Sequence, residues 1–320
     1  GIGWYARKLG MATNSITAVE LVTGTGEIVR ADAEQNQAMF WALRGGGGNF
    51  GVVTALEFRL YPISTAYAGM FVWDIAHAER VLREFADWAP TAPEEVTTSF
   101  RIMRLPPIPE IPEPFRGRSV VVLNGAVLGP DTFAERVIAR FRALQPEIDT
   151  WGRVPAASLS RLHMDPEGPT PAVSNAAMLS SFDARAIDAF VEAVGPDAQT
   201  SMMIAELRQL GGVLGRRHPG AGALPKLDAE MLALGITMTP TLEACAQGHA
   251  ETGEFVAALA PWTAPKTYLN LVENRADAKN GFADEAWKQL AAIRTAVDPD
   301  DVFLANHRIP RMFENGVKTA

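Results

Sequence analysis

The alternation of apolar and polar positions in the first sixty residues predicts a small sheet and one helix. Residues 18–22 and 27–31 alternate on either side of a glycine-containing turn, which is typical of a β-hairpin. Residues 32–43 carry apolar side chains at helical spacing, with Asp32 as the expected N-cap. The alternation returns in 52–61 and predicts a half-buried strand that follows the helix.

From residue 64 to about residue 265, the pattern predicts strands that alternate with amphipathic helices. Strands are expected over 69–73, 97–103, 119–125, 201–210 and 230–239, and helices over 75–88, over 131–144 and from 241 onward. A proline-rich segment, 106–114, has to be an extended loop because proline cannot continue a ladder of backbone hydrogen bonds. This grouping predicts an α+β fold, in which an antiparallel sheet carries helices on one face.

Strand 201–210 carries the polar candidates for chemistry. Alternation places Ile204, Glu206 and Arg208 on the same face. If that face meets a substrate, Glu206 is a candidate base, and Arg208 is a candidate for orienting a carboxylate or a sugar oxygen. An exposed ion pair between the two side chains explains the pattern equally well.

Between the first helix and the strand at 52–61 lies a run of four glycines, 45–48, with Gly51 three residues later. Without Cβ atoms the backbone can adopt positive φ angles and approach a partner closely. Its amide groups could then form a cradle for a cofactor's phosphate, sugar or ring edge. The spacing is that of neither a Walker loop nor a Rossmann loop, so a flexible loop is the alternative.

The glycine run also carries a resemblance to a known family. Residues 41–54 read W-A-L-R-G-G-G-G-N-F-G-V-V-T, which resembles a signature of FAD-linked oxidases of the berberine bridge enzyme type, within the vanillyl-alcohol-oxidase/PCMH-like flavoproteins. Three further segments are similar to that family in the same order: 1–10, 15–29 and 268–310. Four ordered similarities at both ends of the chain identify it as a member of this family.

The resemblance implies a domain organisation. Residues 1–63 would be the second part of a PCMH-type FAD-binding domain, 64–265 a substrate-binding cap, and 266–320 a segment that returns to the FAD-binding domain. Many members attach FAD through a cysteine and a histidine in motifs that would precede Gly1. The chain is therefore expected to be a fragment, or to rely on a lobe supplied elsewhere.

The resemblance also implies which residues bind FAD. Two glycines would end the pyrophosphate loop, two residues of the glycine signature would lie near the adenosine, and two asparagines of the C-terminal segment would approach the flavin. In that order these residues are Gly1 and Gly3, Gly51 and Val53, and Asn270 and Asn306.

Tyr268 is the further candidate for a base, because related enzymes often place a tyrosine there near the flavin ring. A tyrosine hydroxyl ordinarily has a pKa of about 10. It would need a neighbouring positive charge or a hydrogen-bond partner to act at neutral pH. A core tyrosine bonded to main chain is an equally good interpretation, and Leu271 replaces an aromatic residue common in the family's Y-x-N-Y pattern.

Composition excludes several other classes. A formal net charge of -8 and a pI of about 5.3 argue against nucleic-acid and anionic-membrane partners. No continuous apolar stretch is long enough to span a bilayer, and His163 lacks metal-ligand spacing with any other His or Cys, so no metal site is expected. Residues 1–30 show no secretion signal, which leaves the compartment open.

The sequence thus predicts an FAD-dependent oxidoreductase that oxidises an alcohol, sugar or amine carbon of a small molecule. Oxygen or another acceptor would reoxidise the flavin. The alternative is a non-catalytic fragment or binding remnant that keeps the cap without holding flavin. Neither the substrate nor the oligomeric state is indicated by these residues.

Overall fold

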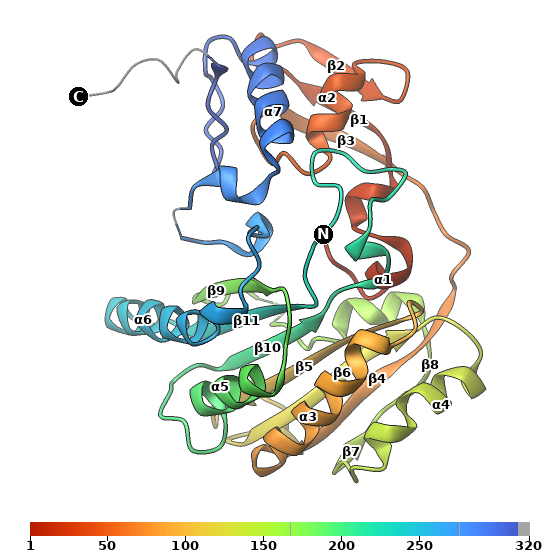
Figure 1. The fold of residues 1–320 in the computed structure, drawn as a ribbon, viewed down its shortest axis with the longest axis vertical. Coiled ribbons are helices and arrows are strands. Elements are labelled where there is room, and N and C mark those ends of the chain that lie inside the picture. The colour runs from red at the N-terminus through yellow and green to blue at the C-terminus, as the bar shows by residue number, and fades with distance from the viewer. Residues whose placement is uncertain (167, 275, 313–320) are drawn as a thin grey trace.

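The computed structural model describes residues 1–166, 168–274 and 276–312. Figure 1 shows two layered parts: a small sheet flanked by α2 and α7, and a large sheet flanked by α3, α4, α5 and α6. The chain passes from the small part to the large one after β3 and returns after α6. Both parts are mixtures of helices and antiparallel strands, so the expected α+β class is confirmed.

The small sheet contains β1 (Ile16–Val22), β2 (Ile28–Asp32) and β3 (Val52–Phe58), in the order β2-β1-β3. The predicted hairpin of β1 and β2 is confirmed by their antiparallel pairing. Helix α2 (Gln37–Leu43) packs its apolar stripe on this sheet, and α7 (Asp284–Val297) lies beside α2. The end of α2 therefore delivers the chain to the glycine run.

The expected N-cap at Asp32 is wrong. Helix α2 begins at Gln37, and Asp32 is the last residue of β2. Its carboxylate accepts hydrogen bonds from the backbone N–H groups of Glu34 and Gln35, both at 2.8 Å. Asp32 therefore caps the turn between the strand and the helix, because a short acidic side chain satisfies the nearest free N–H groups.

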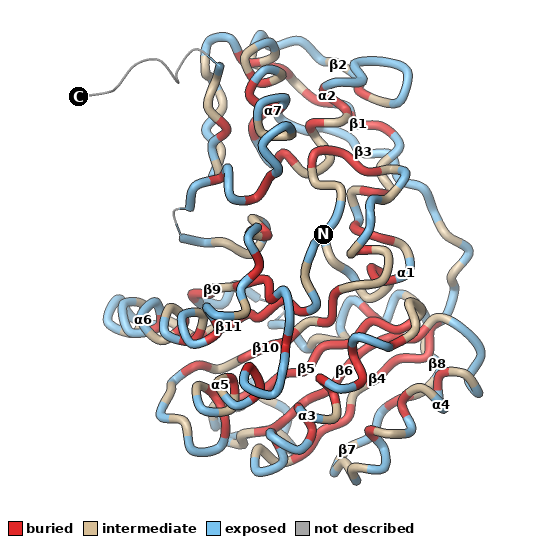
Figure 2. The backbone as a smooth tube through the Cα atoms, viewed as in Figure 1, coloured by how far each residue is buried: buried red, intermediate tan, exposed pale blue. Residues whose placement is uncertain are grey.

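Strand β3 forms where predicted, but the expectation that it is half-buried is wrong. All seven of its residues are exposed, and Val52 and Phe58 keep 59% and 46% of their surface accessible. Strand β3 pairs with β1 on one side only, so it is an edge strand (Figure 2). Within the described residues nothing covers its apolar side chains.

The large sheet is antiparallel and eight-stranded, in the order β7-β4-β6-β5-β10-β11-β9, with β8 also paired to β4. Its strands are β4 (Thr65–Asp74), β5 (Val96–Arg104), β6 (Ser119–Val127), β7 (Ile148–Asp149), β8 (Gly152–Pro155), β9 (Ala172–Leu179), β10 (Ile204–Gln209) and β11 (Met231–Met238). Five of these are the predicted strands with shifted ends. Strand β9 lies in a stretch for which the sequence pattern predicts no element, because its alanines and serine carry little strand signal.

Helices α3 (Ala78–Trp88), α4 (Asp131–Arg142), α5 (Ala184–Val194) and α6 (Leu242–Ala258) share one apolar core with one face of this sheet. The prediction of helices on one face is confirmed, although α5 was not predicted. In strand β10, Ala205 and Leu207 belong to this core. Ile204, Glu206 and Arg208 therefore lie on the opposite face, as the alternation predicts.

The opposite face of the sheet is covered near β4, β5 and β6 by two short segments. One is the 3₁₀ helix η5 (Ala156–Arg161), and the other is the N-terminal segment with α1 (Ala6–Leu9). The indole N–H of Trp4 donates to the Leu159 carbonyl at 3.2 Å and joins the two segments. None of the helices in the described ranges is long and apolar enough to cross a bilayer.

Arg7 fastens α1 to the large sheet. Its guanidinium is 3% exposed and donates to four backbone carbonyls: Leu210 at 2.7 Å, Val96 at 2.6 Å, Pro93 at 3.0 Å and Ala92 at 3.1 Å. Burial lowers the pKa of Arg7 to about 10, against the opposing effect of two nearby glutamates, so the group stays charged at neutral pH. One side chain thus ties the N-terminal segment to β5 and to the end of β10.

We expect Arg7→Gln to lower the free energy of unfolding by about 3 kcal/mol or more, because several buried carbonyls lose their donors at once. Lys8→Gln is the matched control, since Lys8 forms an exposed pair with Glu95 and should cost at most about 1 kcal/mol. Urea unfolding of both variants measures the difference. Equal stabilities for the two variants would contradict this role of Arg7.

Candidate functional site

The glycine run forms a tight turn between α2 and β3. Gly45 and Gly47 have φ angles of +118° and +70°, which other residues rarely adopt. A Cβ on Gly46 would lie 2.5 Å from the Ala42 carbonyl oxygen, whereas a Cβ on Gly48 would meet no atom within 4 Å. Gly46 therefore packs against the protein, while Gly48 faces open space.

Asn49 holds this turn against the C-terminal segment. It is 1% exposed, its amide N–H₂ donates to the carbonyls of Gly46 and His307, both at 3.0 Å, and its carbonyl accepts from Ile309 N at 2.9 Å. The same oxygen accepts from Arg294 Nη1 at 2.8 Å. All the hydrogen-bonding groups of the Asn49 side chain are thus used to join the two segments.

Arg294 of α7 extends this network. It is fully buried, and it also donates to the carbonyls of Ile309 at 2.8 Å and Phe303 at 3.0 Å and to the carboxylate of Asp301 at 2.5 Å. The backbone of 303–309 is therefore fixed beside the glycine turn by two buried side chains. We refer to Asn49 and Arg294 together as the Asn49–Arg294 hub.

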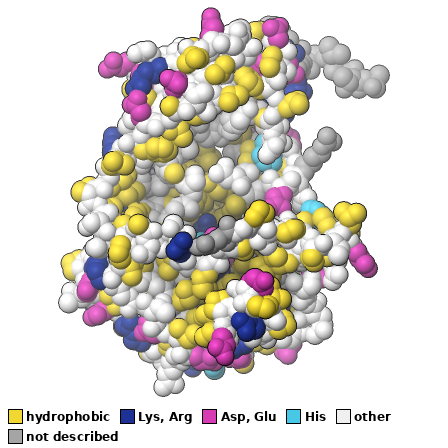
Figure 3. Space-filling model, turned by 180° about the vertical axis from the view of Figure 1, so that it is seen from behind, with side chains coloured by type: hydrophobic (Ala, Val, Ile, Leu, Met, Phe, Trp, Pro, Cys, Tyr) yellow, Lys and Arg dark blue, Asp and Glu magenta, His cyan; other side chains and the backbone are white. Residues whose placement is uncertain are grey.

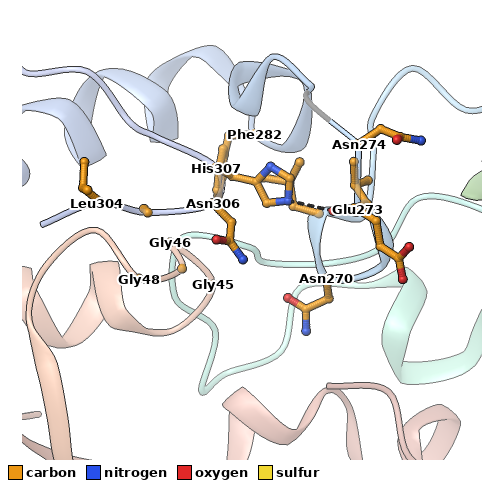
Figure 4. Close-up of a pocket in the computed structure, with 14 residues that line it drawn as sticks. Gly45, Gly46, Gly48, Asn270, Glu273, Asn274, Phe282, Leu304, Asn306 and His307 are labelled. Atoms are coloured by element: carbon orange, nitrogen blue, oxygen red, sulfur yellow. Dashed lines mark hydrogen bonds between the residues drawn. The ribbon is translucent and has the colours of Figure 1, made fainter. Parts of the chain in front are cut away.

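A cavity of about 780 Å³ opens between the glycine turn, the C-terminal segment and the short helix η8 (Leu269–Leu271). Figure 4 shows the amides of Asn270 and Asn306 pointing into the space beside Gly45 and Gly46. Its lining residues are Gly45, Gly46, Gly47, Gly48, Leu269, Asn270, Val272, Glu273, Asn274, Phe282, Leu304, Ala305, Asn306 and His307. Figure 3 shows that hydrophobic side chains surround a hollow in the middle of the molecule.

Two predicted cofactor residues, Asn270 and Asn306, therefore come together here. The other four lie elsewhere: Gly51 packs under Leu21, and Val53 is exposed on β3. Gly3 lines a separate cavity of about 50 Å³ with Trp4, Thr97, His163 and Arg208, and a Cβ on Gly1 would lie 3.7 Å from Ala12. The roles assigned to these four residues stay predictions.

Glu206 and Arg208 lie in a polar cluster on the face of the large sheet opposite the helices. The Glu206 carboxylate accepts from the Ser99 hydroxyl at 2.7 Å and from Arg208 Nε at 2.8 Å. Burial raises the pKa of Glu206, but the positive charges of Arg208 and Arg101 and the hydrogen bond from Arg208 outweigh it, and the net shift is downward. Glu206 is thus ionised at neutral pH, and the expected ion pair with Arg208 forms, but its carboxylate is buried rather than exposed.

His163 bridges two arginines in the same cluster. Its Nε2 lies 3.1 Å from Arg208 Nη2, and its backbone carbonyl accepts from Arg101 Nη1 at 2.9 Å. Burial, together with the two arginines, lowers the pKa of His163 to about 3, against the effect of Glu206. His163 is therefore neutral, and because an arginine can only donate, Nε2 is the acceptor.

Tyr268 directly precedes Leu269 and Asn270, which line the cavity. It immediately precedes η8, is 6% exposed, and packs with Met178 of β9 and with Leu232, which stands opposite Arg208 in the sheet. Burial raises the pKa of its hydroxyl, although Arg208 and Asn270 act in the opposite direction. Tyr268 therefore keeps its proton at neutral pH.

In the described part of the chain, no group of three or more His, Cys, Asp or Glu side chains is placed to hold a metal ion. The residues that sequence reasoning missed are Ser99, Arg101 and the Asn49–Arg294 hub. Ser99 and Arg101 alternate along a predicted strand, and the pairing of that strand with β10 could have brought them to Glu206. No sequence signal links Asn49 to Arg294, which is 245 residues away.

Comparison with known proteins gives relatives over nearly the whole chain. The chain is 26% identical to (R)-6-hydroxynicotine oxidase of Paenarthrobacter nicotinovorans, over 97% of this chain and 68% of that protein. It is 26% identical to the FAD-linked oxidoreductase aurO of Gibberella zeae, over 94% of this chain and 59% of that protein. It thus spans about two thirds or less of the length of these relatives. No family model matches the chain.

Solved structures agree in fold. A berberine bridge enzyme-like protein of Physcomitrella patens superposes with a TM-score of 0.80 at 18% identity, over 97% of this chain and 68% of that one. A variant of berberine bridge enzyme superposes with a TM-score of 0.80 at 16% identity, over 98% of this chain and 68% of that one. The chain is thus similar in sequence to FAD-linked oxidoreductases and shares the fold of berberine bridge enzyme-like proteins. The resemblance seen in its glycine run, hairpin and C-terminal segment is thereby confirmed.

The glycine turn allows a test of which glycine packs against the protein and which faces open space. We expect Gly46→Ala to lower the free energy of unfolding by about 1–3 kcal/mol, because its Cβ would overlap the end of α2. Gly48→Ala should change that free energy by less than about 0.5 kcal/mol, since its Cβ enters open space. Thermal unfolding of the pair is the measurement, and the reverse order would refute the assignment.

Proposed function

We propose that this chain binds FAD in the 780 Å³ cavity and oxidises a small molecule held beside the polar cluster of Glu206 and Arg208. The main observation behind this proposal is that one short segment, 268–270, links the cavity to the polar cluster on the sheet. Asn270 lines the cavity at one end of this segment, and at the other Tyr268 packs with Leu232, the strand partner of Arg208, whose charge acts on the Tyr268 hydroxyl. A substrate on the sheet would thus lie next to a cofactor in the cavity.

The residues of the cavity suit a flavin. A wall without Cβ atoms at Gly48 allows a flat ring or a sugar to approach the backbone closely. The amides of Asn270 and Asn306 offer both donors and acceptors, as a polar ring edge requires. These two side chains would hold the cofactor's polar edge, while the Asn49–Arg294 hub keeps the turn and the tail at a fixed separation.

Bound FAD would supply the hydride acceptor, and the chain's own residues would orient the substrate and handle its proton. Tyr268, which keeps its proton, would donate a hydrogen bond to the reacting oxygen or nitrogen. Glu206, which is ionised, would take the proton, and Arg208 would orient the substrate. An alcohol, a sugar or an amine carbon fits these roles, with oxygen or another acceptor reoxidising the flavin.

The visible absorption spectrum of the purified chain after FAD is added and the free cofactor is removed tests this proposal. We expect flavin bands to co-elute with the protein. Asn306→Leu should weaken FAD binding about ten-fold or more, because a buried polar edge loses its partner. Gln247→Leu, on the exposed side of α6, is the matched control and should bind normally.

A colourless protein that leaves FAD free would count against cofactor binding by this chain. It would favour the alternative of a non-catalytic fragment or binding remnant. If Asn306→Leu and the control bound FAD with equal affinity, Asn306 would not contact the cofactor. The proposal that FAD binds in this cavity would then be refuted.

A further inference from the structure

The polar cluster on the sheet face opposite the helices contains more positive than negative charge. Arg101 and Arg208 are the cations, Glu206 is the buried carboxylate, and His163 is neutral. Asp165 also acts on Arg101, but it is exposed in the loop after His163 and forms no hydrogen bond with the guanidinium. Within the sheet face itself, two guanidinium groups therefore share one carboxylate.

Arg101 is the cation of the cluster with the fewest hydrogen-bond partners. It is 1% exposed, and only its Nη1 has a partner, the His163 carbonyl at 2.9 Å. Its Nε and Nη2 are buried without a hydrogen-bond partner among the described residues. A buried guanidinium with unpaired donors is costly, because the donors have lost water and gained nothing.

Arg208 is the second cation of the cluster, and part of its side chain is accessible to solvent. Its Nε is held by Glu206 and its Nη2 by His163, whereas its Nη1 makes no hydrogen bond within the described ranges. About a fifth of its side chain, 21%, is exposed, and it lines the cavity of about 50 Å³ with Trp4, Thr97 and His163. That volume suits one small polar group rather than a whole substrate.

The orientation of Arg208 is fixed in advance. Glu206 is itself held by the Ser99 hydroxyl at 2.7 Å, so the Arg208 guanidinium is braced from one side by Glu206 and from the other by His163. A preorganised guanidinium loses little side-chain entropy when it binds a carboxylate. The indole of Trp4, whose ring centroid lies 4.5 Å from that of His163, closes this end of the cavity.

We infer that the substrate of this enzyme carries a carboxylate, which Arg208 binds through its free Nη1 while the buried charge of Arg101 strengthens the attraction. This inference rests on the proposed function for the position of the reacting carbon, which would lie on the Tyr268 side of Arg208. It narrows the candidates from alcohols, sugars and amines in general to those that also bear an acid group.

The test compares probes that differ in charge but not in shape. Binding of phenylacetate and of phenylacetamide to the 320-residue chain is measured by calorimetry, with and without FAD, and acetate is compared with acetamide in the same way. We expect each carboxylate to bind at least ten-fold more tightly than its amide. Arg208→Gln should abolish that preference, whereas Arg208→Lys should retain part of it.

Two variants keep the test decisive. Arg216→Gln removes an exposed arginine that pairs with Glu94 and should leave the preference intact. The double variant Glu206→Gln/Arg208→Gln avoids a lone buried carboxylate, so it separates loss of binding from loss of folding. Retention of the preference in the folded double variant, or equal binding of acids and amides by the unaltered chain, would overturn the inference.

FAD binding is followed in the same samples by absorbance. Charge preference without bound FAD would support the carboxylate site while the proposed function fails. Bound FAD without charge preference would support the proposed function and refute the carboxylate site. The two ideas are thus separable in one experiment.

Discussion

The cavity depends on one set of buried hydrogen bonds, those of Asn49 with Arg294 and with the backbone on either side. Asn49 belongs to the glycine turn, Arg294 to α7, and the carbonyl of His307 to the C-terminal segment. Because the side chains of Asn49 and Arg294 are removed from water, each of their donors and acceptors depends on a protein partner. A turn with four glycines would otherwise be free to move. The hub holds the glycine turn in one conformation and fixes the C-terminal segment, the other wall of the cavity, at a constant distance from it.

The second fixed point is Arg7, whose four carbonyl partners come from β5, the turn before it and the end of β10. The N-terminal segment therefore moves with the large sheet rather than with the small one. This placement brings Trp4 and Gly3 next to His163 and Arg208. The polar cluster is thus covered at this point by the N-terminal segment, which includes Gly3, one of the residues predicted to bind FAD.

Sequence reasoning reached the fold class, most strands and helices of the large part, and the shared face of Glu206 and Arg208, because alternation records burial directly. It missed β9 and α5, where alanine-rich segments give a weak signal. It placed Asp32 at a helix terminus, although the carboxylate caps a turn five residues before the helix begins. Arg101 and the Asn49–Arg294 hub could not be found in this way, since their surroundings come from contacts between distant parts of the chain.

Strand β3 has a consequence for how the small sheet could be extended. Its apolar side chains are exposed, and one of its edges carries backbone N–H and C=O groups that β1 does not use. Such an edge is a template for intermolecular β-pairing. The same feature that ends the small sheet is therefore the place where a further strand could be added to it, and the exposed apolar side chains of β3, Val53 among them, would then be covered.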